Sequence, residues 1–204
     1  MLFETWLAFA IASAVLVAIP GPTVMLVVSF ALGQGRRSAW ATVPGVALGD
    51  LVAMVISLAG AGAVLAASAT AFTVLKLAGA VYLIWLGYGL WRSTPKTLEA
   101  KPATGRRLFR DSFTVTVLNP KGIVFFIAFV PQFINTSAPL LPQTSILIAT
   151  FVALGSLNAL LWALAAGTMR DRLTSIRAQR MIGRVGGSFL ILAGLVTALT
   201  RRVA

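Results

Sequence analysis

Long uncharged stretches constrain this chain more than any other feature of its sequence. Residues 122–169 contain no Asp, Glu, Lys or Arg over 48 positions, and residues 5–34 contain none over 30. A transmembrane helix needs about 20 mostly apolar residues. Hydrophobic residues make up 58% of the chain and charged residues 11%, against averages of about 45–50% and about 25% in soluble domains. The sequence therefore predicts an all-α integral membrane protein.

Several residue types that carry chemistry are missing or rare. The chain has no cysteine and no histidine, and only five of its 204 residues are Asp or Glu. These counts exclude Cys and His metal sites, thiol–disulfide exchange and acid–base catalysis by histidine. We expect no metal, no cofactor and no enzymatic activity.

The uncharged stretches divide into six expected membrane spans within a single transmembrane domain. The 48-residue stretch is too long for one span, and the segment 135–143, with Pro139 and Pro142, reads as the turn that divides it. The spans are expected at residues 2–32, 39–65, 71–91, 112–134, 144–167 and 182–199.

Positive charges are distributed unequally over the connections between these spans. Of the 17 Lys and Arg residues, two, six and five fall in the first, third and fifth connections, and only Arg201 and Arg202 fall on the opposite side. Short loops rich in Lys and Arg stay in the cytoplasm, which puts both termini outside. The basic loops also attract anionic lipid headgroups, whereas a nucleic-acid partner is not expected because Phe109 is their one aromatic residue. The 13 cations are Arg36, Arg37, Arg92, Lys96, Lys101, Arg106, Arg107, Arg110, Arg170, Arg172, Arg177, Arg180 and Arg184.

An internal repeat is indicated by the third and sixth spans. Five positions match at a constant offset of 107 residues: Gly79, Tyr82, Leu83, Ile84 and Gly87 correspond to Gly186, Phe189, Leu190, Ile191 and Gly194. The first and fourth spans each carry a proline in mid-span. Two halves of three spans have opposite orientations, which is the inverted-repeat plan of many secondary transporters. The expected repeats cover residues 1–91 and 112–204, joined by a basic cytoplasmic loop at 92–111, although chance recurrence of Gly and Leu is the competing explanation.

Two charged residues are expected near the middle of the membrane. Asp50 lies about 19 Å from the cytoplasmic interface and Lys121 about 16 Å from it, at 1.5 Å per residue. A charge at this depth is costly and marks a functional site by default. Either the two form a structural ion pair, or Asp50 binds a substrate ammonium group or a proton while Lys121, together with Asn119, binds a carboxylate. Asn119 and Asn158 are further polar candidates at similar depth.

The proline breaks are expected to shape this site. Pro20-Gly21-Pro22 removes two backbone donors from the first span, and Pro120 removes one from the fourth. The freed carbonyls need partners from the protein, water or substrate, although a simple packing kink is the alternative. Backbone N–H groups at the second break would favour an anion.

Lys76 and two pairs of glycines each allow two interpretations. Lys76 lies close enough to the end of its span to reach the outer interface, so it is either an interfacial anchor or functional. Gly45 and Gly49, like Gly183 and Gly187, have the four-residue spacing typical of close helix contacts. Those contacts are either intramolecular or part of a homodimer.

These residues together resemble the LysE/RhtB family of bacterial amino-acid exporters along nearly the whole chain. The resemblance is carried by the first proline break, Gly45 to Asp50, Leu75 to Gly87, Asn119-Pro120-Lys121 and Pro131-Gln132-Phe133. It implies a six-helix protein of the bacterial inner membrane that exports amino acids or related metabolites as an antiporter driven by the proton-motive force. A passive channel for small polar solutes is the alternative.

Overall fold

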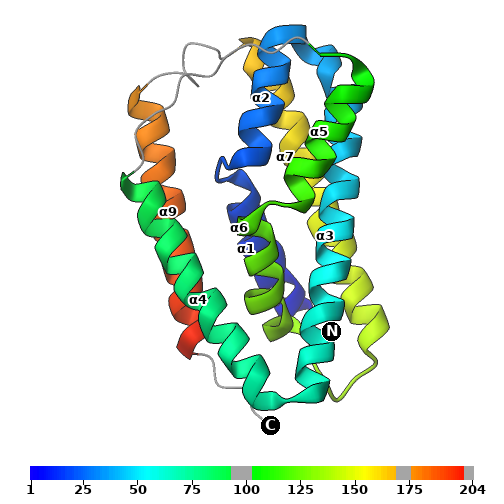
Figure 1. Cartoon of the computed structure of the whole chain (residues 1–204), viewed down its shortest axis with the longest axis vertical. Coiled ribbons are helices and arrows are strands. Elements are labelled where there is room, and N and C mark those ends of the chain that lie inside the picture. The colour runs from blue at the N-terminus through cyan, green and yellow to red at the C-terminus, as the bar shows by residue number, and fades with distance from the viewer. Residues whose placement is uncertain (93–102, 169–175, 200–204) are drawn as a thin grey trace.

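The computed structural model describes residues 1–92, 103–168 and 176–199, and every regular element in these ranges is a helix. The prediction of an all-α membrane protein is confirmed. The helices form an elongated bundle (Figure 1). Their order is α1 (Phe3–Ala18), α2 (Pro22–Gln34), η1 (Gly35–Ser38), α3 (Ala39–Ala67), α4 (Ala69–Arg92), α5 (Gly105–Val117), α6 (Pro120–Val124), η2 (Phe125–Phe129), η3 (Val130–Phe133), α7 (Leu140–Thr168) and α9 (Ile176–Leu199).

The chain runs back and forth along the long axis of the bundle. The start of α1, the α3–α4 connection and the end of α9 lie at one end, and η1 and the start of α5 lie at the other (Figure 1). Four stretches are long and apolar enough to cross a membrane: Pro22–Val64, Ala69–Gly89, Gly105–Phe133 and Leu140–Ala166. Phe3–Ala18 and Gly183–Leu199 are shorter apolar helices. The 43-residue stretch reverses direction at Gly35, whose φ of 70° suits glycine. Six spans remain a prediction.

The structure shows where several residues from the predicted basic loops lie. Arg36 and Arg37 lie in η1, Arg92 ends α4, and Arg106, Arg107 and Arg110 lie in the first turns of α5, all at the end of the bundle where α9 begins (Figure 1). Lys96, Lys101, Arg170, Arg172, Arg201 and Arg202 lie outside the described residues.

Three helices begin at least four residues earlier than the sequence predicted. α5 begins at Gly105 instead of 112, α9 at Ile176 instead of 182, and α7 at Leu140 instead of 144, so α7 includes part of the predicted turn at 135–143. The first turn of α5 is capped by Thr104, whose hydroxyl accepts a hydrogen bond from Arg107 N at 3.4 Å. Its basic residues are therefore helical, although the uncharged stretch begins only after them. The predicted basic loop at 92–111 thus overlaps a helix.

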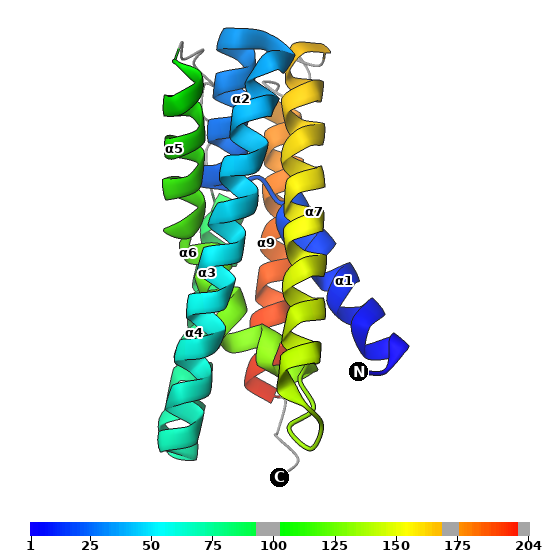
Figure 2. The ribbon, with the colours of Figure 1, turned by 90° about the vertical axis from the view of Figure 1, so that its right-hand side faces the viewer.

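Both proline-containing spans are interrupted at the expected places. The first span consists of α1 and α2, separated at residues 19–21, and the fourth consists of α5 and α6, separated at residues 118 and 119. Figure 2 shows α1 leaning outward from the axis that α2 follows. Beyond the second break, α6 continues into the single π-helical turn η2 and then into η3.

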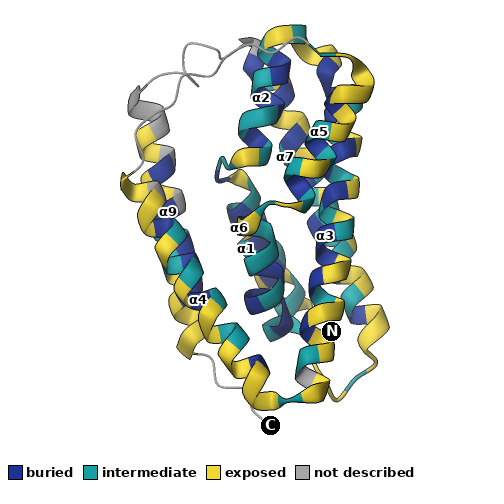
Figure 3. Ribbon diagram, in the orientation of Figure 1, coloured by how far each residue is buried: buried dark blue, intermediate teal, exposed yellow. Residues whose placement is uncertain are grey.

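Apolar side chains face both inward and outward. A core of buried aromatic and aliphatic residues, among them Phe9, Phe125 and Phe151, joins α1, η2 and α7. Large hydrophobic residues such as Ile56, Val81 and Leu161 are exposed on the outer faces of the helices, and exposed residues follow those faces in Figure 3. Outward-facing hydrophobic residues are what a helix needs in lipid.

Helices α4 and α9 pack side by side along one flank of the bundle (Figure 1). A Cβ atom on Gly87 would lie 2.5 Å from Gly187 O and 3.0 Å from Ile191 N. A Cβ atom on Gly194 would lie 2.7 Å from Ala80 O and 3.3 Å from Ile84 N. Adding 107 to the α4 residues Ala80, Ile84 and Gly87 gives the α9 residues Gly187, Ile191 and Gly194. Small residues allow this close approach.

Candidate functional site

The first helix break leaves backbone carbonyl groups that α1 itself cannot satisfy. In a continuous helix the N–H of residue 20 would bond to the carbonyl of Leu16, but Pro20 has no N–H. Pro22 occupies the first position of α2, where a missing N–H costs nothing. The end of α1 therefore presents free carbonyl oxygens inside a membrane protein, where each needs a donor.

Lys121 supplies two of these donors from the other break. Its Nζ donates to Leu16 O at 2.9 Å and to Ile19 O at 2.8 Å. The side chain is buried, with 8% of its surface exposed. A cation at the carboxyl end of a helix also interacts favourably with the helix dipole. Lys121 therefore links the second break directly to the first.

Asn158 supplies a third donor. Its Nδ2 donates to Val17 O at 2.9 Å, from the middle of α7. The end of α1 is thus held by side chains from two elements that are far away in the sequence.

The second break is satisfied mostly by its own residues. Pro120 frees the carbonyl of Thr116, and Asn119 N donates to this oxygen at 3.1 Å. The Asn119 side chain caps α6, since its Oδ1 accepts a hydrogen bond from Lys121 N at 3.2 Å.

Thr23 joins the two breaks from α2. Its Oγ1 accepts hydrogen bonds from Asn119 Nδ2 and from Thr116 Oγ1, each at 3.3 Å. The sequence analysis did not predict Thr23 as a site residue. Its position, a polar residue directly after Pro22, is the signal that could have identified it.

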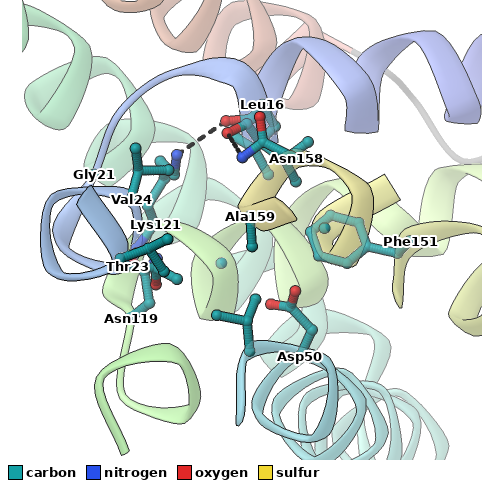
Figure 4. A pocket seen from close by; sticks show the side chains of 15 residues that line it. Leu16, Gly21, Thr23, Val24, Asp50, Asn119, Lys121, Phe151, Asn158 and Ala159 are labelled. Atoms are coloured by element: carbon teal, nitrogen blue, oxygen red, sulfur yellow. Dashed lines mark hydrogen bonds between the residues drawn. The ribbon is translucent and has the colours of Figure 1, made fainter. Parts of the chain in front are cut away.

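A small pocket lies between the breaks, α3 and α7. Figure 4 shows the Asp50 carboxylate directed toward it from α3, with Lys121 on a different wall. Its volume is about 40 Å³. One water molecule needs about 10–15 Å³ of such space, so the pocket holds about three waters. An amino acid would need it to widen.

Asp50 makes no hydrogen bond or ion pair to any residue in the described ranges. The two salt bridges found there join Arg107 and Arg110 to Asp111 at 3.4 and 3.1 Å. The direct Asp50–Lys121 ion pair, one of two alternatives from the sequence, is therefore not formed in this conformation. The Asp50 carboxylate contacts the backbone of Gly155. A Cβ atom added to Gly155 would overlap with Asp50 Oδ2.

Most of the predicted site residues come together around this pocket. Gly21, Asp50, Asn119, Lys121 and Asn158 all line it. Pro20, Pro22 and Pro120 do not line it but define the breaks beside it. Sequence reasoning missed Thr23, Gly155 and the apolar wall, which includes Leu16, Val24 and Phe151. Lys76 is half-buried on α4 and does not line the pocket.

Comparison with known proteins identifies the family of this chain. The family described as LysE type translocator matches residues 14–201. The chain belongs to the LysE family. It is 32% identical to the homoserine/homoserine lactone efflux protein of Salmonella typhi over 98% of this chain and 99% of that protein. It is 26% identical to the leucine efflux protein of Enterobacter sp. (strain 638), over 86% of this chain and 84% of that protein.

The LysE family membership confirms the resemblance drawn from the sequence motifs. A 28% identical relative from Vibrio cholerae, matched over 97% of this chain, is named only as an uncharacterized membrane protein. No solved structure was found to match the chain. This member of the LysE family is therefore a multi-pass membrane protein whose named relatives are efflux proteins.

Proposed function

We propose that this protein exports an amino acid or a closely related metabolite by secondary active transport, through the pocket between the two helix breaks. The observation that carries the proposal is a pocket-facing carboxylate, Asp50, that has no partner among the described residues and lies across from a buried lysine. The printed names of the relatives, homoserine/homoserine lactone efflux protein and leucine efflux protein, support the substrate class.

The substrate ammonium group binds Asp50 in this proposal. Asn158 faces the same pocket, and its Oδ1 accepts no hydrogen bond from the described residues, while its Nδ2 is engaged by Val17 O. A carboxylate and an amide oxygen together satisfy an ammonium group, which has three donors and no acceptor.

The substrate carboxylate binds near Lys121. Two of the three Nζ donors of Lys121 are used by Leu16 O and Ile19 O, which leaves one for a ligand. The first turn of α2 also lines the pocket through Thr23 and Val24, and the N-terminus of a helix favours an anion. Asn119 acts mainly by capping α6 and holding Thr23.

We infer that the chain consists of two inverted repeats, about 1–91 and 112–204. The support is the offset of 107 between the matched contact residues of α4 and α9, and the proline at the first position of both α2 and α6. Rocking of one repeat against the other would open the pocket alternately to the two sides.

We further infer proton antiport and a location in the bacterial inner membrane with both termini outside. Asp50 is the group that alternates between substrate and proton. The clustering of the described basic segments at one end of the bundle supports the orientation, because basic loops stay in the cytoplasm.

Amino-acid efflux from preloaded cells tests the role of Asp50. Asp50→Asn keeps the shape of the side chain and removes its charge, so export should fall at least about tenfold at matched expression. Asp111→Asn is the matched control, since Asp111 forms its salt bridges at the surface, and its export should stay near wild type. Unchanged, still proton-driven export by Asp50→Asn would overturn the assigned role.

An uncoupler separates the exporter from the passive channel. The exporter accumulates its substrate outside against a gradient and loses this ability when the proton gradient collapses. Flux that is only downhill and insensitive to the uncoupler would show a channel instead. A screen for amino acids and analogues that overexpression allows cells to tolerate would identify the substrate.

A further inference from the structure

A groove on the outer surface of the bundle lies apart from the central pocket. It is formed between η1, the first turns of α3 and the second half of α7, and its volume is about 450 Å³. η1 contacts α7, and Figure 2 shows α3 and α7 running side by side below the η1 turn. The residues used below are Arg36, Arg37, Trp40, Val43, Leu160 and Leu164.

The groove is charged at one end and apolar along the rest. Arg36 and Arg37 lie at the η1 end and are exposed. Val43, Leu160 and Leu164 form the apolar length. A ligand that fits both parts has an anionic head and a hydrocarbon tail.

The two arginines differ from the basic residues on α5. Arg107 and Arg110 are paired with Asp111, whereas Arg36 and Arg37 form no salt bridge with any described residue. Arginine binds phosphate through two parallel hydrogen bonds, so a pair of unneutralised arginines suits a phosphate group well.

Trp40 marks the boundary between the two parts. Its side chain is 87% exposed beside the arginines and the apolar wall. Tryptophan is enriched at the level of the lipid headgroups. The order of the groove's parts, arginines, then tryptophan, then apolar residues, matches the order of phosphate and acyl chain in a phospholipid.

We propose that this groove binds one anionic phospholipid, with its phosphate on Arg36 and Arg37 and an acyl chain along Val43, Leu160 and Leu164. The lipid would brace η1, the connection between α2 and α3. Both helices line the central pocket, through Thr23 and Asp50. The proposal does not depend on whether the protein is an exporter or a channel.

The test is lipid binding by the purified full-length chain in detergent, measured by native mass spectrometry. Phosphatidylglycerol should bind more tightly than phosphatidylcholine with the same acyl chains. Arg36→Gln/Arg37→Gln should weaken phosphatidylglycerol binding about 10- to 30-fold, since each basic residue near an anionic lipid surface contributes to the attraction. Arg180→Gln/Arg184→Gln removes the same charge from exposed positions on α9 and should change binding less than about twofold.

A second variant tests the apolar part of the groove. Leu160→Trp fills the groove without changing charge, so it should reduce phosphatidylglycerol binding several-fold while the melting temperature stays within a few degrees of wild type. Leu160→Trp also tests the proposal if Arg36→Gln/Arg37→Gln does not fold. Soluble glycerol phosphate should not compete, because it lacks the acyl chain.

Three results would each overturn the proposal. The first is equal binding by wild type and Arg36→Gln/Arg37→Gln, and the second is an equal loss in the α9 control, which would indicate general charge attraction. The third is full competition by glycerol phosphate, which would indicate a site for a free phosphate and not for a lipid.

Discussion

The two helix breaks contain the same kind of residue but are stabilised differently. At the second break, the carbonyl of Thr116 that Pro120 frees is bonded by the backbone of its neighbour Asn119. At the first break, the carbonyls of Leu16, Val17 and Ile19 are bonded by side chains more than 100 residues away in the sequence.

This difference indicates which break changes its contacts when other helices move. The second break is capped mostly by its own residues, so its shape depends less on the rest of the molecule. The first break depends on Lys121 and Asn158, so movement of α6 or α7 changes how the end of α1 is held. Substrate binding at the same lysine would therefore reach α1 directly.

The largest expected effect is that of Lys121→Met. The change leaves the buried carbonyls of Leu16 and Ile19 without donors, at about 1–3 kcal/mol each, so the free energy of unfolding should fall by about 2–6 kcal/mol. Thermal melting in detergent measures it. Lys76→Met, on a half-buried lysine of α4, should cost clearly less, and a Lys121→Met protein that melts like wild type would contradict the account of the first break.

Asn158→Leu should have the next largest effect. It keeps the volume of the side chain and removes one donor, to Val17 O, so the expected loss is about 1–3 kcal/mol. Melting measured for the single variants and for Lys121→Met/Asn158→Leu completes a double-mutant cycle. Since both residues hold the same end of α1, the losses should not add, and strict additivity would show that the two contacts are independent.

A smaller effect is expected at the second break. Asn119→Ala removes the cap of α6 and the hydrogen bond to Thr23 Oγ1. It should cost about 1–2 kcal/mol, because the backbone bond from residue 119 to Thr116 O remains. Asn119→Ser keeps a capping oxygen and should restore most of the melting temperature. If Asn119→Ala lowered the free energy of unfolding as much as Lys121→Met, the two breaks would not differ in how strongly they depend on side-chain donors.

The smallest effect is expected for Gly21→Ala. Gly21 has φ −122° and ψ −167°, which any residue can adopt, and its Cβ would lie 3.5 Å from Lys121 Nζ, an ordinary contact. Stability should change by only a few tenths of a kcal/mol. Gly35→Ala, at φ 70°, should cost about 1–3 kcal/mol instead. A Gly21→Ala loss as large as that at Gly35 would show that the first break needs glycine for its conformation.

The position of both breaks could be predicted from the sequence because it follows from one chemical fact, the missing N–H of proline. The common level of Asp50 and Lys121 along the bundle could also be predicted, since helix rise converts residue counts into distance, and both residues line the same pocket. For these reasons five of the proposed site residues line one pocket in the structure.

The partners of Lys121 could not be predicted in the same way. Apolar side chains surround these helices on all sides, so the local pattern does not fix how each helix is rotated about its axis. Whether Lys121 faces Asp50, a ligand or the end of α1 depends on that rotation. Gly155 was missed for a related reason, since its importance lies in the Asp50 carboxylate that packs against it from another helix.

The small size of the central pocket has a consequence for proton leakage across the membrane. Three water molecules in a row cover about 8 Å, at about 2.8 Å between oxygens, and a bilayer core is about 30 Å thick. The waters that this pocket can hold are therefore too few to form, by themselves, a proton wire across the bilayer. In this conformation the pocket provides no continuous water path for protons, however many copies of the protein a membrane holds.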